Sequence, residues 1–141
     1  MLSILRENIQ GTTMLDHIGL SVNDLARSRE FYRAALAPLG FGLVMEVTRE
    51  QTGGNAFLGF GPPGRPLFWL GEGHNPPGRV HVAFEAQTRA KVDAFYRAAL
   101  EAGGKDNGPP GLRPKYHKNY YAAFVIDPDG HNVELVCHAA E

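Results

Sequence analysis

The stretch "HIGLSVNDLARSREFYRAALAPLG" at residues 17–40 is repeated, without a gap, as "HVAFEAQTRAKVDAFYRAALEAGG" at residues 81–104. The copies lie 64 residues apart and share the hexapeptide FYRAAL, at 31–36 and at 95–100. An identity of this length in a chain of 141 residues indicates an internal duplication. The duplicated unit therefore decides the fold.

Each copy begins with alternating, strand-like residues and continues into an amphipathic helix. Asp24 and Thr88 occupy equivalent positions before the two helices, and both residue types are favoured at a helix N-cap. In the second copy the apolar residues follow helical spacing: Val92, Phe95, Tyr96, Ala99 and Leu100. Gly40 and the pair Gly103–Gly104 then favour helix ends, because glycine readily adopts the left-handed conformation found there.

Short strand-like runs separated by turns follow each helix. They are FGLVMEV (41–47), NAFLGFG (55–61) and PLFWLGE (66–72) in the first half, and YYAAFVI (120–126) and NVELVCH (132–138) in the second. A further short strand is predicted near 105–108, and the stretch 106–119, rich in Pro and Gly, is predicted to be a covering loop. Each half is thus predicted to be a βαβββ module. The expected fold is α+β, with two modules forming a cupped mixed sheet.

The length of the chain fits one domain with one core. We expect a single domain over residues 14–141, with module one at about 14–75 and module two at about 78–138. Residues 1–13 are interpreted as an N-terminal extension, namely a loose arm, a dimer-contacting helix or a segment ahead of a functional start at Met14.

The composition limits the partners and the compartment. A formal net charge of −1 gives no electrostatic reason to expect nucleic acid or an anionic membrane as partner. Arg6 and Glu7 fall where a secretory signal would need apolar residues, and no apolar run is long enough to span a bilayer. The single cysteine, Cys137, excludes an internal disulfide and suits a reducing compartment. We therefore expect a cytoplasmic protein, and the composition leaves its function open.

Alternation along three strands points to a site. Successive side chains of a strand face opposite sides, so the apolar residues at 17–22, 80–85 and 132–137 predict the sides that pack under the helices. The same alternation turns His17, His81 and Glu134 the other way. If both sheets curl round one cleft, the three side chains form a facial triad that leaves coordination positions open. The ordinary alternative is that each is a hydrogen-bonded or solvated residue with no ion.

These features resemble the vicinal oxygen chelate superfamily, which includes glyoxalase I, extradiol dioxygenases, and fosfomycin and bleomycin resistance proteins. The resemblance covers about 15–138 and rests on residues 15–41, on VHVAFEA (80–86) and on AAFVIDPDGHNVELV (122–136). It implies metal ligands that project from paired βαβββ modules into a cup, and it assigns His17, His81 and Glu134 as those ligands. It also implies a homodimer, in which modules pair within one chain or are exchanged between chains.

The chain departs from glyoxalase I on the last strand of module one. The resemblance implies a further carboxylate there, which acts as ligand and proton-transfer base. Aligning Leu70 with Leu135 instead puts Trp69 opposite Glu134, and an indole neither binds a metal ion nor accepts the proton. The remaining two His and one Glu are similar to the ligand set of extradiol dioxygenases.

The covering loop supplies further candidates. Tyr116, His117 and Tyr120 are predicted to be catalytic groups that assist proton transfer. Arg113 and Tyr121 are predicted to bind substrate together with Trp69, because Arg and Tyr suit an anionic or phenolic ligand. His131, in the turn DPDGHN, is expected to be exposed.

The sequence thus favours a metal-dependent enzyme that acts on a small oxygen-chelating substrate, either dioxygenase-like or lyase-like. The expected cofactor is a divalent metal ion, most naturally Fe²⁺, with Mn²⁺, Ni²⁺, Co²⁺ or Zn²⁺ as alternatives. One alternative is a metal-free protein that binds a drug or another small molecule, as in the bleomycin-resistance branch. Another is a structural partner protein.

Overall fold

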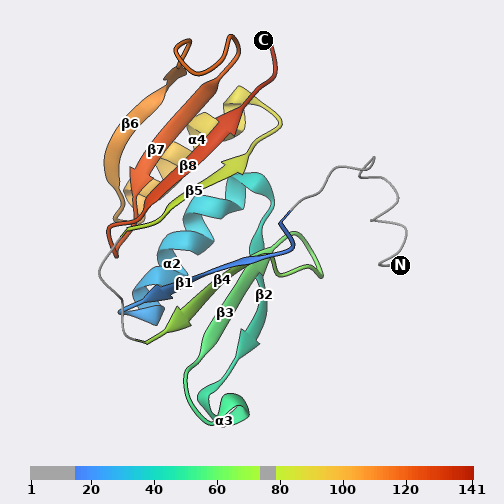
Figure 1. Cartoon of the computed structure of the whole chain (residues 1–141), viewed down its shortest axis with the longest axis vertical. Helices are drawn as coiled ribbons and strands as arrows, with labels where there is room; N and C mark the ends of the chain where they lie inside the picture. Colours follow the sequence, from blue (N-terminus) through green and yellow to red (C-terminus); the bar gives the residue numbers. More distant parts are fainter. Residues whose placement is uncertain (1–14, 74–78) are drawn as a thin grey trace.

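The computed structural model describes residues 15–73 and 79–141, so the predicted extension at 1–13 lies outside the described residues. Two units with the same order of strands and main helix follow one another along the chain (Figure 1). The first contains β1 (Ile18–Val22), α2 (Leu25–Leu36), η1 (Ala37–Leu39), β2 (Gly42–Val47), α3 (Arg49–Thr52), β3 (Phe57–Gly61) and β4 (Phe68–Glu72). The second contains β5 (His81–Glu85), α4 (Arg89–Glu101), β6 (Lys105–Leu112), β7 (Tyr121–Ile126) and β8 (Asn132–Cys137).

The two units have the same sheet topology. Their strand orders are β1-β4-β3-β2 and β5-β8-β7-β6. In each sheet the first strand pairs in parallel with the last strand of its unit, and the remaining pairs are antiparallel. The prediction of an α+β fold built from two βαβββ modules is therefore confirmed.

The N-caps of both main helices are formed by the residues that the repeat predicts. A carboxylate oxygen of Asp24 accepts a bond from the backbone N–H of Arg27 at 3.1 Å, and the Thr88 hydroxyl accepts one from Lys91 N–H at 3.2 Å. The helix α3, of four residues, is not predicted by the sequence, because it is too short to show a helical period. It is held by a capping box between Thr48 and Gln51.

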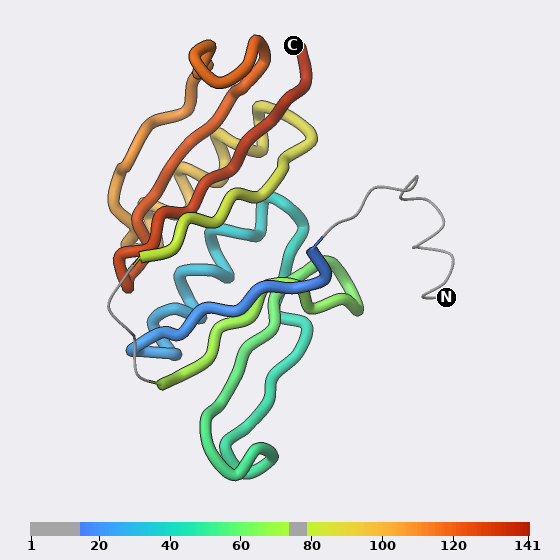
Figure 2. Tube along the Cα trace, in the orientation of Figure 1, coloured from blue at the N-terminus to red at the C-terminus, as the bar shows by residue number. Residues whose placement is uncertain are grey.

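One core joins the two modules. Helix α2 packs against α4, and in Figure 2 its trace runs between the two sheets. Aromatic rings of the two modules are in contact. The ring centroid of Phe84 in β5 lies 5.3 Å from that of Phe68 in β4 and 6.1 Å from that of Phe41. Because the helices and the apolar strand faces lie inside this core, the opposite faces of the two sheets point outward.

The prediction of a loop over 106–119 is wrong for its first part. Strand β6 pairs with β7 as far as Leu112, with register shifts at Asp106/Gly108 and at Gly108/Gly111. The strand tolerates Pro109 and Pro110 because β6 lies at the edge of its sheet, where a proline need not donate to a neighbouring strand.

The turn at 127–130 ties module two to α2. Its carboxylate Asp127, 5% exposed, accepts a bond from the Tyr32 hydroxyl at 2.5 Å, and Asp129 accepts one from the Ser28 hydroxyl at 3.3 Å. This packing corrects the expectation for His131, which is 2% exposed rather than solvent-facing. The Nδ1 of His131 accepts a bond from the backbone N–H of Val80 at 3.1 Å.

In the parts of the chain that the structure describes, no helix is both long and apolar enough to cross a lipid bilayer.

Candidate functional site

A buried carboxylate stands on the outward face of module two. Glu134 lies on β8, paired with Ala83 of β5, and its side chain is only 1% exposed. One carboxylate oxygen, Oε1, lies 2.8 Å from His81 Nε2, and the other accepts a hydrogen bond from the Tyr120 hydroxyl. The His81 ring is 53% exposed. The structure therefore brings together two predicted ligands and one predicted catalytic residue.

The surroundings of Glu134 suit a bound cation. Burial, together with the hydrogen bond and charge of Glu134, raises the pKa of Tyr120 to about 12, so the phenol stays protonated and donates. A buried carboxylate is costly unless it is paired and hydrogen-bonded. A carboxylate oxygen and an imidazole nitrogen side by side are ligands that first-row divalent metals accept. The residues present therefore fit a divalent ion, to which Glu134 and His81 would supply two protein ligands.

His17 lies on the outward face of module one. It immediately precedes β1, its side chain is 60% exposed, and its Nδ1 lies 2.8 Å from a carboxylate oxygen of Asp16. A carboxylate on one ring nitrogen orients the ring and is a common arrangement for metal-binding histidines. His17 lines a shallow cavity of about 320 Å³ together with Gly19, Leu20, Ser21, Phe57, Trp69 and Gly71.

The single chain does not bring all three predicted ligands together. Within residues 15–73 and 79–141, no group of three or more His, Cys, Asp and Glu side chains is arranged to hold one ion. The reason is the core: α2 and α4 pack between the modules, so the face with His17 and the face with Glu134 both point outward.

Trp69 occupies the place in module one that Glu134 occupies in module two. Trp69 pairs with Gly19 of β1, and Glu134 pairs with Ala83 of β5. Gly19 and Ala83 are equivalent in the repeat, so the predicted alignment agrees with the observed register. The indole covers Gly59, where an added Cβ would come within 3.0 Å of the ring.

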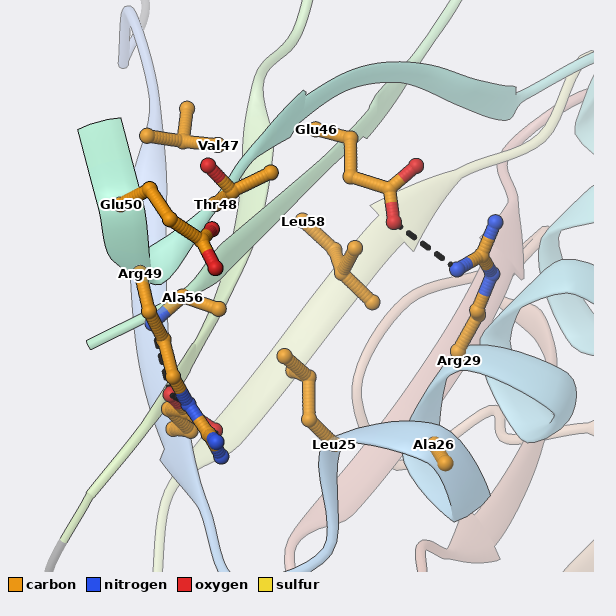
Figure 3. A pocket seen from close by; sticks show the side chains of 11 residues that line it. Leu25, Ala26, Arg29, Glu46, Val47, Thr48, Arg49, Glu50, Ala56 and Leu58 are labelled. Carbon is orange, nitrogen blue, oxygen red and sulfur yellow. Dashed lines mark hydrogen bonds and ion pairs between the residues drawn. The ribbon is translucent and has the colours of Figure 1, made fainter. Parts of the chain in front are cut away.

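Two carboxylates of module one, Glu46 and Glu72, are turned to the helix side. Glu46 and Glu72 line a cavity of about 390 Å³ between α2 and the β2–α3–β3 segment (Figure 3). In this cavity Glu46 pairs with Arg29 at 2.9 Å, and Glu72 receives two bonds from Arg49, at 2.5 and 2.7 Å. Neither carboxylate is therefore on the face with Trp69.

The loop residues divide between the site and its surroundings. Tyr116 packs on Tyr120 with ring centroids 5.1 Å apart. The exposed His117 instead packs on His138, at 6.0 Å between ring centroids, and His138 in turn packs on Tyr120 at 5.4 Å. Arg113 lies over the ring of Phe124, the residue that pairs with Glu134 across β7 and β8.

Tyr121 is not brought to this group. Its hydroxyl donates to Asp93 of α4 at 2.6 Å, and the Arg89 guanidinium lies over its ring. It follows Tyr120 directly, and strand alternation therefore turns it to the helix side.

Comparison with protein families gives one match over most of the chain. The model of the Glyoxalase/Bleomycin resistance protein/Dioxygenase superfamily matches residues 14–135. Among curated proteins, lactoylglutathione lyase GLX1 of Arabidopsis thaliana is 32% identical over 135 residues, which cover 85% of this chain and 42% of the relative. The chain thus spans about two fifths of the length of that relative.

Solved structures agree with the fold. A glyoxalase/bleomycin resistance protein from Albidiferax ferrireducens is 28% identical, with a TM-score of 0.67 over 90% of this chain and all (100%) of that one. A mutant of the fosfomycin resistance protein FosX from Listeria monocytogenes, complexed with Mn(II) and a dihydroxypropylphosphonic acid, is 21% identical. Its TM-score is 0.66 over 92% of this chain and 94% of that one, which is a likeness of fold.

Proposed function

The chain belongs to the Glyoxalase/Bleomycin resistance protein/Dioxygenase superfamily, and on this premise we propose that it is a metal-dependent, lyase-like enzyme acting on a small oxygen-chelating substrate. The observation that carries the proposal is the buried carboxylate of Glu134, held between the His81 imidazole and the Tyr120 hydroxyl. The similarity to a lactoylglutathione lyase favours lyase chemistry over dioxygenase chemistry. When bound, a divalent ion supplies a Lewis acid that polarises substrate oxygens.

The third ligand, in this proposal, is His17 of a second copy of the chain. Two features support an exchange of modules in a homodimer. The two ligand-bearing faces point outward from one shared core, and His17 is absent from the group around Glu134. A second copy that lays its module-one face over the module-two face would add the missing imidazole and close the site from water.

The roles of the remaining side chains follow from their contacts. Glu134 and His81 would hold the ion, and the Tyr120 hydroxyl donates to one oxygen of Glu134, so the carboxylate has one orientation. Trp69 has no group that accepts a proton, so proton transfer falls to substrate and solvent or to groups of the 113–120 loop, such as Tyr116 and His117. Trp69 instead offers a flat apolar wall to the bound substrate.

The experiment that tests the proposal is metal titration of the metal-free protein, with Mn²⁺, Fe²⁺, Ni²⁺, Co²⁺ and Zn²⁺ compared. We expect about one ion per chain for the parent, and loss of that ion in His81→Ala and in His17→Ala. The matched control is His117→Ala, an exposed histidine outside the ligand group. Equal metal content in the parent and in both ligand variants would refute the site.

Mixing the two variants tests the exchange of modules. A heterodimer of His17→Ala and His81→Ala chains would have one intact site, because each chain supplies the ligand that the other lacks. Random exchange of equal amounts makes about half of the dimers heterodimers, each with one intact site of two, so we expect the mixture to recover about a quarter of the parent's metal binding. If the three ligands came from one chain, mixing would restore nothing.

A second function is favoured by the aromatic walls of module one. Trp69 covers Gly59, and the ring of Phe57 covers Gly71, where an added Cβ would lie 2.7 Å from it. Such a surface suits a metal-free protein that binds a flat drug-like molecule. A parent protein that takes up no metal ion, but whose tryptophan fluorescence changes with aromatic ligands, would support this function instead. Oxygen consumption by the Fe²⁺-loaded protein with a catechol would indicate dioxygenase chemistry.

A further inference from the structure

A third cavity lies beside the β7–β8 pair that carries Glu134, on the outward face of module two, and its lining is cationic. Its volume is about 280 Å³, and it is formed between β6, β7, β8 and the loop after β6. Arg113 and Lys115 line it, together with Tyr116, Phe124, Asn132 and the Asn107–Gly108 segment of β6. None of these lining residues is acidic, in a chain whose acidic and basic residues are otherwise almost balanced.

Two residues that line the cavity contact residues of the candidate metal site. Phe124 pairs with Glu134 across β7 and β8, and its ring centroid lies 6.3 Å from that of His81. Tyr116, on another wall, packs on Tyr120, the residue that donates to Glu134. A molecule whose oxygens reach an ion on Glu134 can therefore place a neighbouring group in this cavity.

The Arg113 guanidinium is fixed in place before any ligand arrives. It donates to the carbonyl oxygens of Gly111 at 2.8 Å and of Pro109 at 2.6 Å, and it lies 5.5 Å from the centre of the Phe124 ring. Two nearby glycines leave room for the guanidinium. A Cβ added at Gly111 would lie 3.0 Å from a guanidinium nitrogen of Arg113, and one added at Gly108 would lie 3.3 Å from the other. A cation that is already ordered loses little entropy on binding a ligand.

The bonding of Arg113 leaves donors for a ligand. A guanidinium has about five N–H groups in a planar fork. Two nitrogens of the Arg113 guanidinium donate hydrogen bonds, and both acceptors are backbone carbonyl oxygens. Among the described residues, no carboxylate forms an ion pair with Arg113. The remaining N–H groups match the paired oxygens of an oxyacid anion.

We propose that this cavity is an anion subsite, in which Arg113 and Lys115 bind a carboxylate or phosphonate group of the substrate. The inference rests on the proposed function, because it takes Glu134 as the neighbouring metal ligand. The substrate class is then a small oxyacid whose chelating oxygens lie close to its anionic group. The volume suits one such group, since pockets that enclose drug-sized ligands are larger, at about 300–1,000 Å³.

The test uses the full-length, metal-free protein, because the subsite needs no ion to hold an anion. Acetate, methylphosphonate and inorganic phosphate are titrated separately, and binding is followed by calorimetry and by NMR shifts of the backbone amides of the non-proline residues at 107–116. We expect saturable binding by the parent, and at least about a tenfold loss of affinity in Arg113→Gln, the scale of a charged hydrogen bond. Comparison of acetate with methylphosphonate decides between the two oxyacids.

Three further variants keep the result interpretable. Arg27→Gln makes the same change of charge at an exposed arginine that lines another cavity, beside the 127–130 turn, and should leave the affinity unchanged. Gly111→Ala and Arg113→Lys retain the positive charge but displace or remove the planar fork, and both should weaken binding. They decide the question if Arg113→Gln fails to fold.

The outcomes separate the two proposals. Absence of saturable anion binding in the parent, or equal affinity in the parent and the Arg113 variants, would overturn the subsite even if the protein binds its metal ion. Binding lost equally in Arg27→Gln would also overturn it, because the anion would then respond only to net charge. Anion binding that depends on Arg113, in a parent that takes up no metal ion, would retain the subsite and refute the metal-dependent function.

Discussion

Trp69 and Glu134 are equivalent residues of the two modules, one indole and one carboxylate, each paired with the first strand of its own sheet. The duplication therefore keeps the geometry of this position and changes its chemistry. Module two carries the buried carboxylate that the proposed function uses as a metal ligand. Module one provides an apolar wall and, through His17, one imidazole.

Restoring a carboxylate at Trp69 should therefore strengthen metal binding. In Trp69→Glu the new carboxylate stands at the place equivalent to Glu134, on the same face as His17. We expect at least about tenfold tighter binding of Mn²⁺, equal to about 1.4 kcal/mol, than in the matched control Trp69→Gln. Both affinities are measured by competition with a chelating dye. Equal affinities would show that residue 69 does not face the ion.

Tyr120→Phe should weaken metal binding without loss of the fold. The Tyr120 hydroxyl is the donor to the second oxygen of Glu134, and its removal leaves this buried carboxylate with one fewer partner and a less fixed orientation. Loss of such a partner of a metal ligand typically lowers metal affinity by about 10–100-fold. Tyr116→Phe is the matched control, because Tyr116 is an exposed neighbour that packs on Tyr120 through its ring. If both variants bind the ion as tightly as the parent, Tyr120 does not position Glu134.

The modules could be predicted from the sequence because several independent local patterns indicate each of them. The repeat, the caps at Asp24 and Thr88 and the alternation along β8 all agree with the observed elements. The same alternation predicted that Glu134 faces away from α4. It did not predict that Glu134 is buried there, since alternation along β8 does not show that the hydroxyl of Tyr120, just before β7, reaches Glu134.

The errors have a common physical cause, which is packing between segments far apart in the chain. The burial of His131 depends on how the 127–130 turn docks on α2, and the extent of β6 depends on its place at a sheet edge. Whether His17 meets Glu134 depends on which faces the two amphipathic helices cover. A single sequence shows that both helices are amphipathic, but it does not show that they pack against each other.

Glu72→Gln should lower stability near neutral pH and have no effect in strong acid. The hydrogen bonds from Arg49 and from the backbone N–H of Ala56 lower the pKa of Glu72 to about 2, from its ordinary value near 4.5. Because the pKa is lower in the folded state, this stabilisation is complete above about pH 4.5 and is lost as the pH falls towards 2. The effect is modest, since the Arg49 side chain is 71% exposed.

Urea unfolding of Glu72→Gln at a series of pH values measures this difference. The control is Glu101→Gln, an exposed glutamate at the end of α4. A difference between Glu72→Gln and the parent that persists unchanged at about pH 2 would contradict the assigned ionisation.

Tyr32→Phe should weaken the junction between the modules. The Tyr32 hydroxyl is fully buried and donates to Asp127, and burial raises its pKa well above the ordinary value, so it remains a donor. Removing it leaves a carboxylate oxygen of Asp127 without that donor inside the core. We expect a loss of about 1.5–3 kcal/mol in the free energy of unfolding, as for hydrogen bonds to charged groups. Tyr96→Phe is the control, because the Tyr96 hydroxyl meets Asp106 nearer the surface. The free energies of unfolding are measured with urea. If Tyr32→Phe and Tyr96→Phe lose equal amounts, the buried hydrogen bond to Asp127 does not stabilise the contact between α2 and module two more than a surface bond would.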